Sequence, residues 1–217
     1  MRGMGQDILK MERKRQEFLE IGFKLFAERT IETVTLPQIA EASRYGIATL
    51  YRYFDKKPGF VVAVATWKWE QFVEENRKRR PYTEFDGMTA ADIFEFYLDS
   101  FLELYRNHRD LLRFNQFFNI YIRSEKVDAE AICPYQAFIQ ELESQFHEMY
   151  LKAEQDHTLR TDVPEQEMFS TTLHLMLAAV TRYAVGLVYH PKNGFDAEKE
   201  LFLQKNMLLR EYAPDNN

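Results

Sequence analysis

The sequence predicts an all-α protein, and three observations support this expectation. Only 8 glycines and 7 prolines interrupt the 217 residues, while strong helix formers such as Leu, Ala, Glu and Lys are plentiful. Apolar residues recur at the i, i+3, i+4, i+7 spacing of helices along most of the chain. With 46% hydrophobic residues, the chain can bury a substantial core in one large or two small domains.

In the N-terminal part, the sequence predicts a first helix and a clearly marked start of a second helix. Apolar residues at helical spacing place the first helix at about residues 10–29. The hydroxyl of Thr35 can cap the free N–H groups of the next helix, and Gln38, three residues later, completes a capping box. Pro37 is tolerated in the first turn because its missing N–H costs nothing there. We therefore expect the second helix to begin directly after Thr35.

A tight turn at Ser43–Gly46 separates this helix from a third, short helical pattern over residues 47–54. Two short helices joined by a tight turn are the geometry of a helix-turn-helix, whose second helix enters the major groove of DNA. Leu50 and Phe54 are expected in the small core. The expected outer side offers groups that bind phosphates and base edges: Thr49, Arg52 and Tyr53, with Tyr51 nearby.

We therefore predict an N-terminal three-helix DNA-binding domain over residues 1–57, with the helix-turn-helix at about residues 35–54. For residues 58–217 we predict a C-terminal helical bundle that binds a ligand and forms the dimer. Its helical patterns lie at about residues 57–80, 93–105, 111–121, 135–150, 164–188 and 195–212.

The bundle is expected to hold a small effector and to form a homodimer. Helical bundles build ligand sites between facing helices from apolar walls with a few polar groups. The pocket candidates are Tyr97, Phe101, Tyr105, Phe117, Tyr121, His174 and Tyr183. Small side chains let the last two helices approach a partner copy closely, and the dimer-interface candidates are Ala178, Ala179, Ala184, Gly186, Leu201 and Leu208.

Charge separates the two parts of the chain. The net charge is -6, yet residues 1–60 carry 11 Lys and Arg against 8 Asp and Glu, while the remainder carries 17 against 26. The single cysteine, Cys133, the absence of an apolar signal-peptide core and the lack of a segment of about 20 apolar residues predict a cytoplasmic protein with no membrane partner.

No catalytic set, cofactor site or metal site is predicted. Glu143 and His147 lie one helical turn apart, but no third ligand is placed near them by spacing. His174 alone is more typical of a hydrogen-bonded core histidine than of a ligand. The scarce glycines form no phosphate-binding loop.

Several strings together resemble the tetracycline-repressor (TetR) family over residues 10 to about 65: Lys14–Glu17, Phe23–Glu28, Ile39–Ala42, and Thr49–Phe54 followed by Lys57. The resemblance implies a phosphate contact for Thr35 and DNA contacts for the positions around the third helix. With the flanking side chains included, the predicted DNA-binding set is Thr35, Arg44, Tyr45, Gly46, Ile47, Ala48, Thr49, Tyr51, Arg52, Tyr53 and Lys57.

The sequence departs from that family at two turn positions. Thr30 stands where the family usually has a glycine after its first helix, and Arg44 stands at the glycine of the recognition turn. A left-handed backbone at either residue would cost roughly 1–2 kcal/mol. Ile47 and Ala48 also replace the common Lys-Gly pair, which removes one cation that would reach phosphate.

The resemblance implies a transcriptional repressor, a homodimer released from a pseudo-palindromic operator by a small hydrophobic or aromatic effector. Two other classes stay open. One is an enzyme built on the C-terminal helices, for which no catalytic set is found. The other is a helical ligand-binding or adaptor protein with a non-functional helix-turn-helix. Salt-dependent binding of duplex DNA separates the regulator from both.

Overall fold

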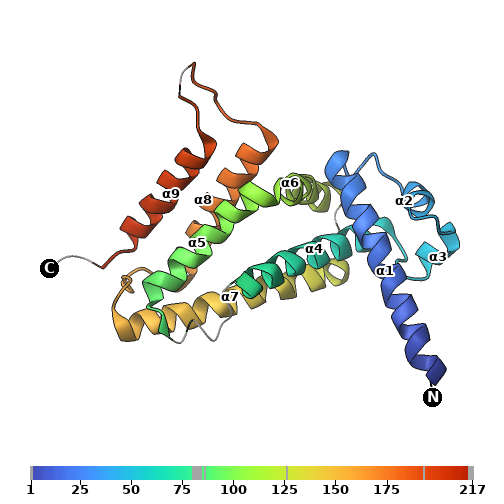
Figure 1. The fold of residues 1–217 in the computed structure, drawn as a ribbon, viewed down its shortest axis with the longest axis horizontal. Coiled ribbons are helices and arrows are strands. Elements are labelled where there is room, and N and C mark those ends of the chain that lie inside the picture. Colours follow the sequence, from blue (N-terminus) through green and yellow to red (C-terminus); the bar gives the residue numbers. More distant parts are fainter. Residues whose placement is uncertain (1, 80–84, 86, 126, 193, 215–217) are drawn as a thin grey trace. The chain divides into compact units, whose positions relative to one another are not determined.

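The computed structural model describes residues 2–79, 85, 87–125, 127–192 and 194–214, with side chains from Asp7 onward. Within these residues the chain forms nine helices and no strand, which confirms the all-α prediction (Figure 1). The helices are α1 (Arg2–Glu28), α2 (Leu36–Ala42), α3 (Ile47–Tyr51), α4 (Lys57–Arg79), α5 (Ala90–Asn107), α6 (Arg109–Ser124), α7 (Ala129–Asp156), α8 (Glu165–Val185) and α9 (Ala197–Glu211).

The helices form two compact units. The first contains Met1–Gln71 together with Arg113–Phe138, and the second contains Phe72–Leu112 together with Ile139–Asn217. Helices α4, α6 and α7 each contribute residues to both units. The boundary after residue 57 separates roles in the sequence rather than compact bodies, and it stays a prediction about function.

The core of the first unit holds the helix-turn-helix against α1 and α4. Leu50 is fully buried and Phe54 almost so, as the sequence predicts, and the Phe54 ring meets the edge of Phe60 with centroids 4.7 Å apart. Helices α1 and α4 touch at Gly22, where an added Cβ would lie only 2.5 Å from the Phe60 ring. A side chain at Gly22 would therefore push α1 away from α4.

The core of the second unit is built by α5, α8 and α9, with further apolar side chains from α7. Phe94 is fully buried there, and its ring meets the edges of Phe146 and Tyr212. The start of α5 is tied to the end of α7, because the Ala90 N–H donates to Asp156 Oδ2 at 2.7 Å. This bond satisfies a backbone donor that the helix leaves free.

Several helix ends differ from the predicted ones. Helix α1 begins at Arg2, earlier than the apolar pattern indicates, although Gly3, Gly5 and Asp7 are weak helix formers. Helix α7 begins at Ala129 and contains Pro134, near its start. Helix α3 ends at Tyr51, since the next residues belong to the turn that leads into α4.

Candidate nucleic-acid interface

The start of α2 is held by the predicted capping box. The Gln38 N–H donates to Thr35 Oγ1 at 3.4 Å, and the Thr35 N–H donates to Gln38 Oε1 at 2.8 Å. Two backbone donors at the helix start are thereby satisfied by side chains. The capping box fixes the entry into the helix-turn-helix and leaves the Thr35 side chain at the surface.

The turn between α2 and α3 stores strain at Arg44. Its φ is +59°, whereas Thr30 is not among the described non-glycine residues with positive φ. The turn closes through the Tyr45 N–H, which donates to the Ala40 carbonyl at 3.0 Å. The departure from the family's glycine therefore has a conformational cost at Arg44 and none of this kind at Thr30.

Relieving this strain is expected to stabilise the protein. Arg44→Asn should raise the free energy of unfolding by about 1 kcal/mol, because asparagine tolerates the left-handed region better than arginine. Arg44→Gly should gain less, since glycine also adds conformational freedom to the unfolded chain. Chemical denaturation measures both, and Arg52→Asn, at a position with negative φ, is the control. A loss of stability in Arg44→Asn would contradict this account.

All eleven predicted DNA-binding residues lie at the surface. Thr49 is helical, within α3, and Tyr51 is 50% exposed. Residues classed as exposed are Thr35, Arg44, Gly46, Ala48, Tyr51 and Arg52, and those half-buried are Tyr45, Ile47, Thr49, Tyr53 and Lys57. None of these side chains is sealed inside the protein, so α3 can present hydroxyl and guanidinium groups to a duplex.

Two of the tyrosines are also fixed to α1. The Tyr45 hydroxyl donates to Glu17 Oε2 at 2.6 Å, a bond that lowers the pKa of Glu17 and raises the pKa of Tyr45. The rings of Tyr45 and Tyr53 lie 5.3 and 5.9 Å from that of Phe18. These contacts orient the recognition turn on α1.

Lys57 has a partner within the chain. Its ammonium donates to the Glu32 carbonyl at 3.2 Å and lies 5.7 Å from the Tyr121 ring centroid. Burial lowers the pKa of Lys57. The lysine thus ties the loop before α2 to the start of α4, and its contact with phosphate stays a prediction.

The seven pocket candidates are divided between the two units. Phe117 and Tyr121 belong to the first unit, and the other five belong to the second. Contrary to the expectation of a core histidine, His174 is exposed on α8. Tyr105 is buried and meets the edge of Tyr183, whose hydroxyl donates to Glu200. Burial and this hydrogen bond raise the pKa of Tyr183 to about 12.

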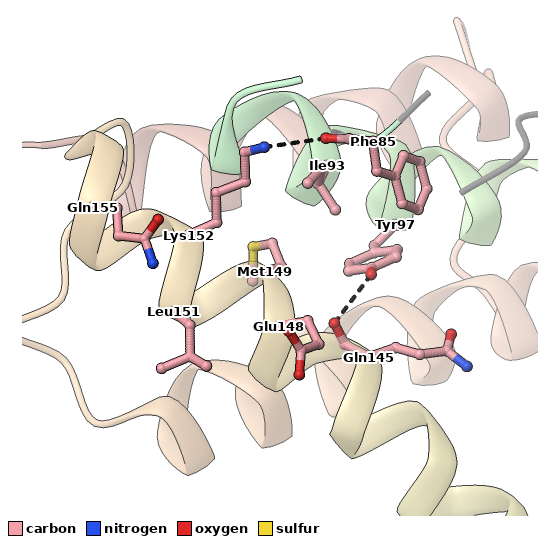
Figure 2. A pocket seen from close by; sticks show the side chains of 9 residues that line it. All are labelled: Phe85, Ile93, Tyr97, Gln145, Glu148, Met149, Leu151, Lys152 and Gln155. Atoms are coloured by element: carbon pink, nitrogen blue, oxygen red, sulfur yellow. Dashed lines mark hydrogen bonds between the residues drawn. The ribbon is translucent and has the colours of Figure 1, made fainter. Parts of the chain in front are cut away.

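A groove of about 450 Å³ lies between α5 and α7 in the second unit (Figure 2). Tyr97 is the one pocket candidate that lines it, and its hydroxyl donates to the Gln145 carbonyl at 3.2 Å. At the other end, Lys152 Nζ donates to the Phe85 carbonyl at 3.1 Å. The complete lining is Phe85, Ile93, Tyr97, Gln145, Glu148, Met149, Leu151, Lys152 and Gln155.

Most of the groove was not predicted. Six of the missed residues come from α7, whose polar side chains at Gln145, Glu148 and Lys152 share one side of the helix at spacings of three and four. That spacing was the available signal. The aromatic candidates do not reveal this side of α7, because Tyr97 is the one candidate that lines the groove.

Two of the dimer-interface candidates are buried within the second unit. Leu201 and Leu208 are 0% and 6% exposed in the core of the second unit, so they cannot contact a partner without unpacking it. Gly186 ends α8 with φ +76°, which explains the glycine by backbone conformation. Ala178 is exposed, and Ala179 and Ala184 are half-buried. Large apolar side chains exposed on α8 and α9 are Leu175, Phe202, Leu203 and Met207.

The described residues contain no group of three or more His, Cys, Asp or Glu arranged to hold a metal ion. His147 Nδ1 instead lies 2.9 Å from Glu165 Oε2, which raises the pKa of His147. In the same part of the chain, every helix is too short or too polar to span a bilayer.

Residues 18–64 match the model of a protein family described as bacterial regulatory proteins, tetR family. The match covers α3, the turn before it and the helices that support both. Over residues 18–64 the chain is therefore similar to TetR-family transcriptional regulators. Regulators of that family are non-enzymatic. No curated protein sequence matches this chain.

Solved structures of transcriptional regulators show the same fold as this chain over most of its length. A TetR family transcription regulator from Marinobacter aquaeolei VT8 is 19% identical, with a TM-score of 0.63, and the match covers 95% of this chain and 99% of that one. FadR from Bacillus subtilis in complex with stearoyl-CoA is 13% identical, with a TM-score of 0.65, and the match covers 89% of this chain and 97% of that one. AibR in complex with isovaleryl coenzyme A and operator DNA is 16% identical, with a TM-score of 0.62, and the match covers 90% of this chain and 98% of that one.

Proposed function

We propose that this regulator is a repressor, a homodimer that binds a pseudo-palindromic operator through α3 and is released by a small hydrophobic or aromatic effector. The observation that carries the DNA-binding part is the surface of α3, where Thr49, Tyr51 and Arg52 are accessible on a turn fixed to α1. A two-fold dimer presents two such helices to two half-sites.

Exposed apolar side chains on α8 and α9 support the homodimer. Leu175, Phe202, Leu203 and Met207 are each between 49% and 67% exposed, and Ala178 leaves room beside them. Several such side chains on one helical hairpin favour burial against a second copy over exposure to water. Light scattering at micromolar concentration is expected to give a dimer, and a monomer would contradict the proposal.

The groove between α5 and α7 is the proposed effector site. Its volume lies in the range of small-molecule pockets, and it combines apolar walls with the polar tips of Tyr97, Gln145 and Lys152. The acyl-CoA ligands of FadR from Bacillus subtilis and of AibR make acyl thioesters the first compounds to test. An acyl chain suits Ile93 and Met149.

Helix α4 is the proposed link between effector and DNA. It begins at Lys57, directly after the helix-turn-helix, and its last turn is tied to both helices of the groove. Arg79 pairs with Glu103 of α5 at 2.5 Å and lowers the pKa of that carboxyl, and Arg77 lies 3.5 Å from Glu141 of α7. A ligand that changes the spacing of α5 and α7 would therefore displace the end of α4, and the coupling must be reciprocal.

Filling the groove is expected to abolish induction while leaving DNA binding intact. Gln145→Trp places a large ring in the groove from a half-buried position. Fluorescence anisotropy of labelled operator DNA is measured with isovaleryl-CoA, stearoyl-CoA and benzoate. The wild type should release DNA with one of them, Gln145→Trp should not, and Ser144→Trp, at an exposed position of α7 outside the groove, should behave as wild type. Equal release midpoints for Gln145→Trp and wild type would contradict the site.

A further inference from the structure

The helix-turn-helix carries few cations for a DNA-binding surface. Between Thr35 and Lys57, a stretch that is fully described, the basic residues are Arg44, Arg52, Lys56 and Lys57. The ammonium of Lys57 already donates to the Glu32 carbonyl. Because affinity for a duplex and its salt dependence both grow with the number of phosphates neutralised, this surface needs further cations.

The first half of α1 carries such cations. Lys10, Arg13, Lys14 and Arg15, here called the α1 basic segment, lie within six residues that contain one acid, Glu12. Lys10, Arg13 and Arg15 are exposed, and Lys14 is half-buried. The rest of the chain beyond residue 60 has an excess of acids, so the α1 basic segment supplies much of the positive charge that a polyanion can approach.

Contacts within the first unit place the α1 basic segment beside the recognition turn. Lys14 Nζ lies 5.5 Å from the ring centroid of Tyr45. The guanidinium carbon of Arg15 lies 5.5 Å from the ring centroid of Phe54, a residue that follows α3. Lys10 lies one helical turn beyond Lys14, about 6 Å farther along the axis. The segment therefore borders the same corner of the fold as the residues that contact DNA.

The acid nearest to this corner is already engaged. Glu17 accepts hydrogen bonds from the Tyr45 hydroxyl at 2.6 Å and from Arg13 Nε at 3.2 Å. The charge of Glu17 is therefore partly compensated by these two hydrogen bonds. The corner keeps a positive excess.

We propose that the α1 basic segment binds phosphates of the operator duplex next to the bases read by α3. The alternative is that the segment is only a solvated helix face, stabilised by the Arg13–Glu17 ion pair. The contacts of Lys14 and Arg15 with the helix-turn-helix favour the DNA-binding role, because they fix the cations on the recognition side. The segment adds affinity without sequence discrimination.

The test is the salt dependence of DNA binding by the full-length protein. In Lys10→Gln/Lys14→Gln/Arg15→Gln, the slope of log affinity against log salt should become shallower by about 2–3, roughly one per lost phosphate contact. Affinity near 0.1 M salt should fall at least about tenfold for the operator and for an unrelated duplex alike. The ratio of the two affinities should stay unchanged.

A matched control uses the other end of the same helix. Lys24→Gln/Arg29→Gln removes exposed cations where α1 packs towards α4 and α6, and its slope should equal that of the wild type. If the triple variant unfolds at a lower temperature than the wild type, Lys10→Gln alone is measured instead, and its slope of log affinity against log salt should change by about one. An unchanged slope in both basic-segment variants, or an equal change in the control, would overturn the proposal. Loss of operator preference alone would place the defect in α3 instead.

Discussion

Replacing Thr49 and Tyr51 together with alanine is expected to weaken operator binding at least about 30-fold. Each contact with a base edge or a phosphate contributes about 1–3 kcal/mol, and 1.4 kcal/mol corresponds to a factor of ten. Thr49 is half-buried and Tyr51 is 50% exposed, so neither is part of the core, and alanine favours the helix. The fold should persist while the reading surface is lost.

Anisotropy titration of labelled operator DNA measures this loss. Tyr189→Ala is the matched control, because Tyr189 is 83% exposed and lies outside the helix-turn-helix. Unlike the charge variants of α1, the double variant should also lower the preference for operator over unrelated DNA. Wild-type affinity in Thr49→Ala/Tyr51→Ala would contradict the assignment of α3 as the recognition helix.

Lys205→Ala is expected to lower the free energy of unfolding by about 2–3 kcal/mol. Lys205 of α9 is 3% exposed, and its ammonium lies 2.5 Å from Asp99 Oδ1 and 2.8 Å from Glu95 Oε1, both on α5. Truncation removes two charge-assisted hydrogen bonds and leaves a cavity. The loss is not larger because both carboxylates are half exposed and regain water.

A second variant separates charge from packing. Lys205→Met keeps the aliphatic stem, so its loss in chemical denaturation should be about half that of Lys205→Ala. Burial acts to lower the pKa of Lys205, but Asp99 and Glu95 raise it above the ordinary value of 10.5. A raised folded pKa means that the stabilisation is fully present below 10.5 and is lost as the pH rises through the folded value. Wild-type stability in Lys205→Ala at neutral pH would contradict the ion-pair account.

Local signals in the sequence predicted the helix-turn-helix well. The capping box of Thr35 and Gln38, the core positions Leu50 and Phe54, and the strain at Arg44 depend on residues close in sequence, and the structure shows each of them. Helix ends were less predictable, because Gly3, Gly5 and Asp7 favour a loop by propensity, yet α1 begins at Arg2.

Contacts between distant segments were beyond the sequence pattern. On α9, Leu201 faces the core while Phe202 and Leu203 are exposed, and spacing alone does not distinguish adjacent apolar residues on a helix with apolar residues on two sides. The pairing of Lys205 with α5 spans about a hundred residues of sequence. The groove likewise combines Tyr97 with α7, which only the packing of the second unit brings together.

Selection of bound duplexes from a random DNA library tests the central claim most directly. A two-fold dimer that reads DNA through α3 should enrich an inverted repeat whose half-site centres lie about one helical turn, 10–10.5 base pairs, or a multiple of it, apart. Thr49→Ala/Tyr51→Ala should enrich nothing. If the wild-type protein also enriched no sequence, the assignment of this surface to operator recognition would fail.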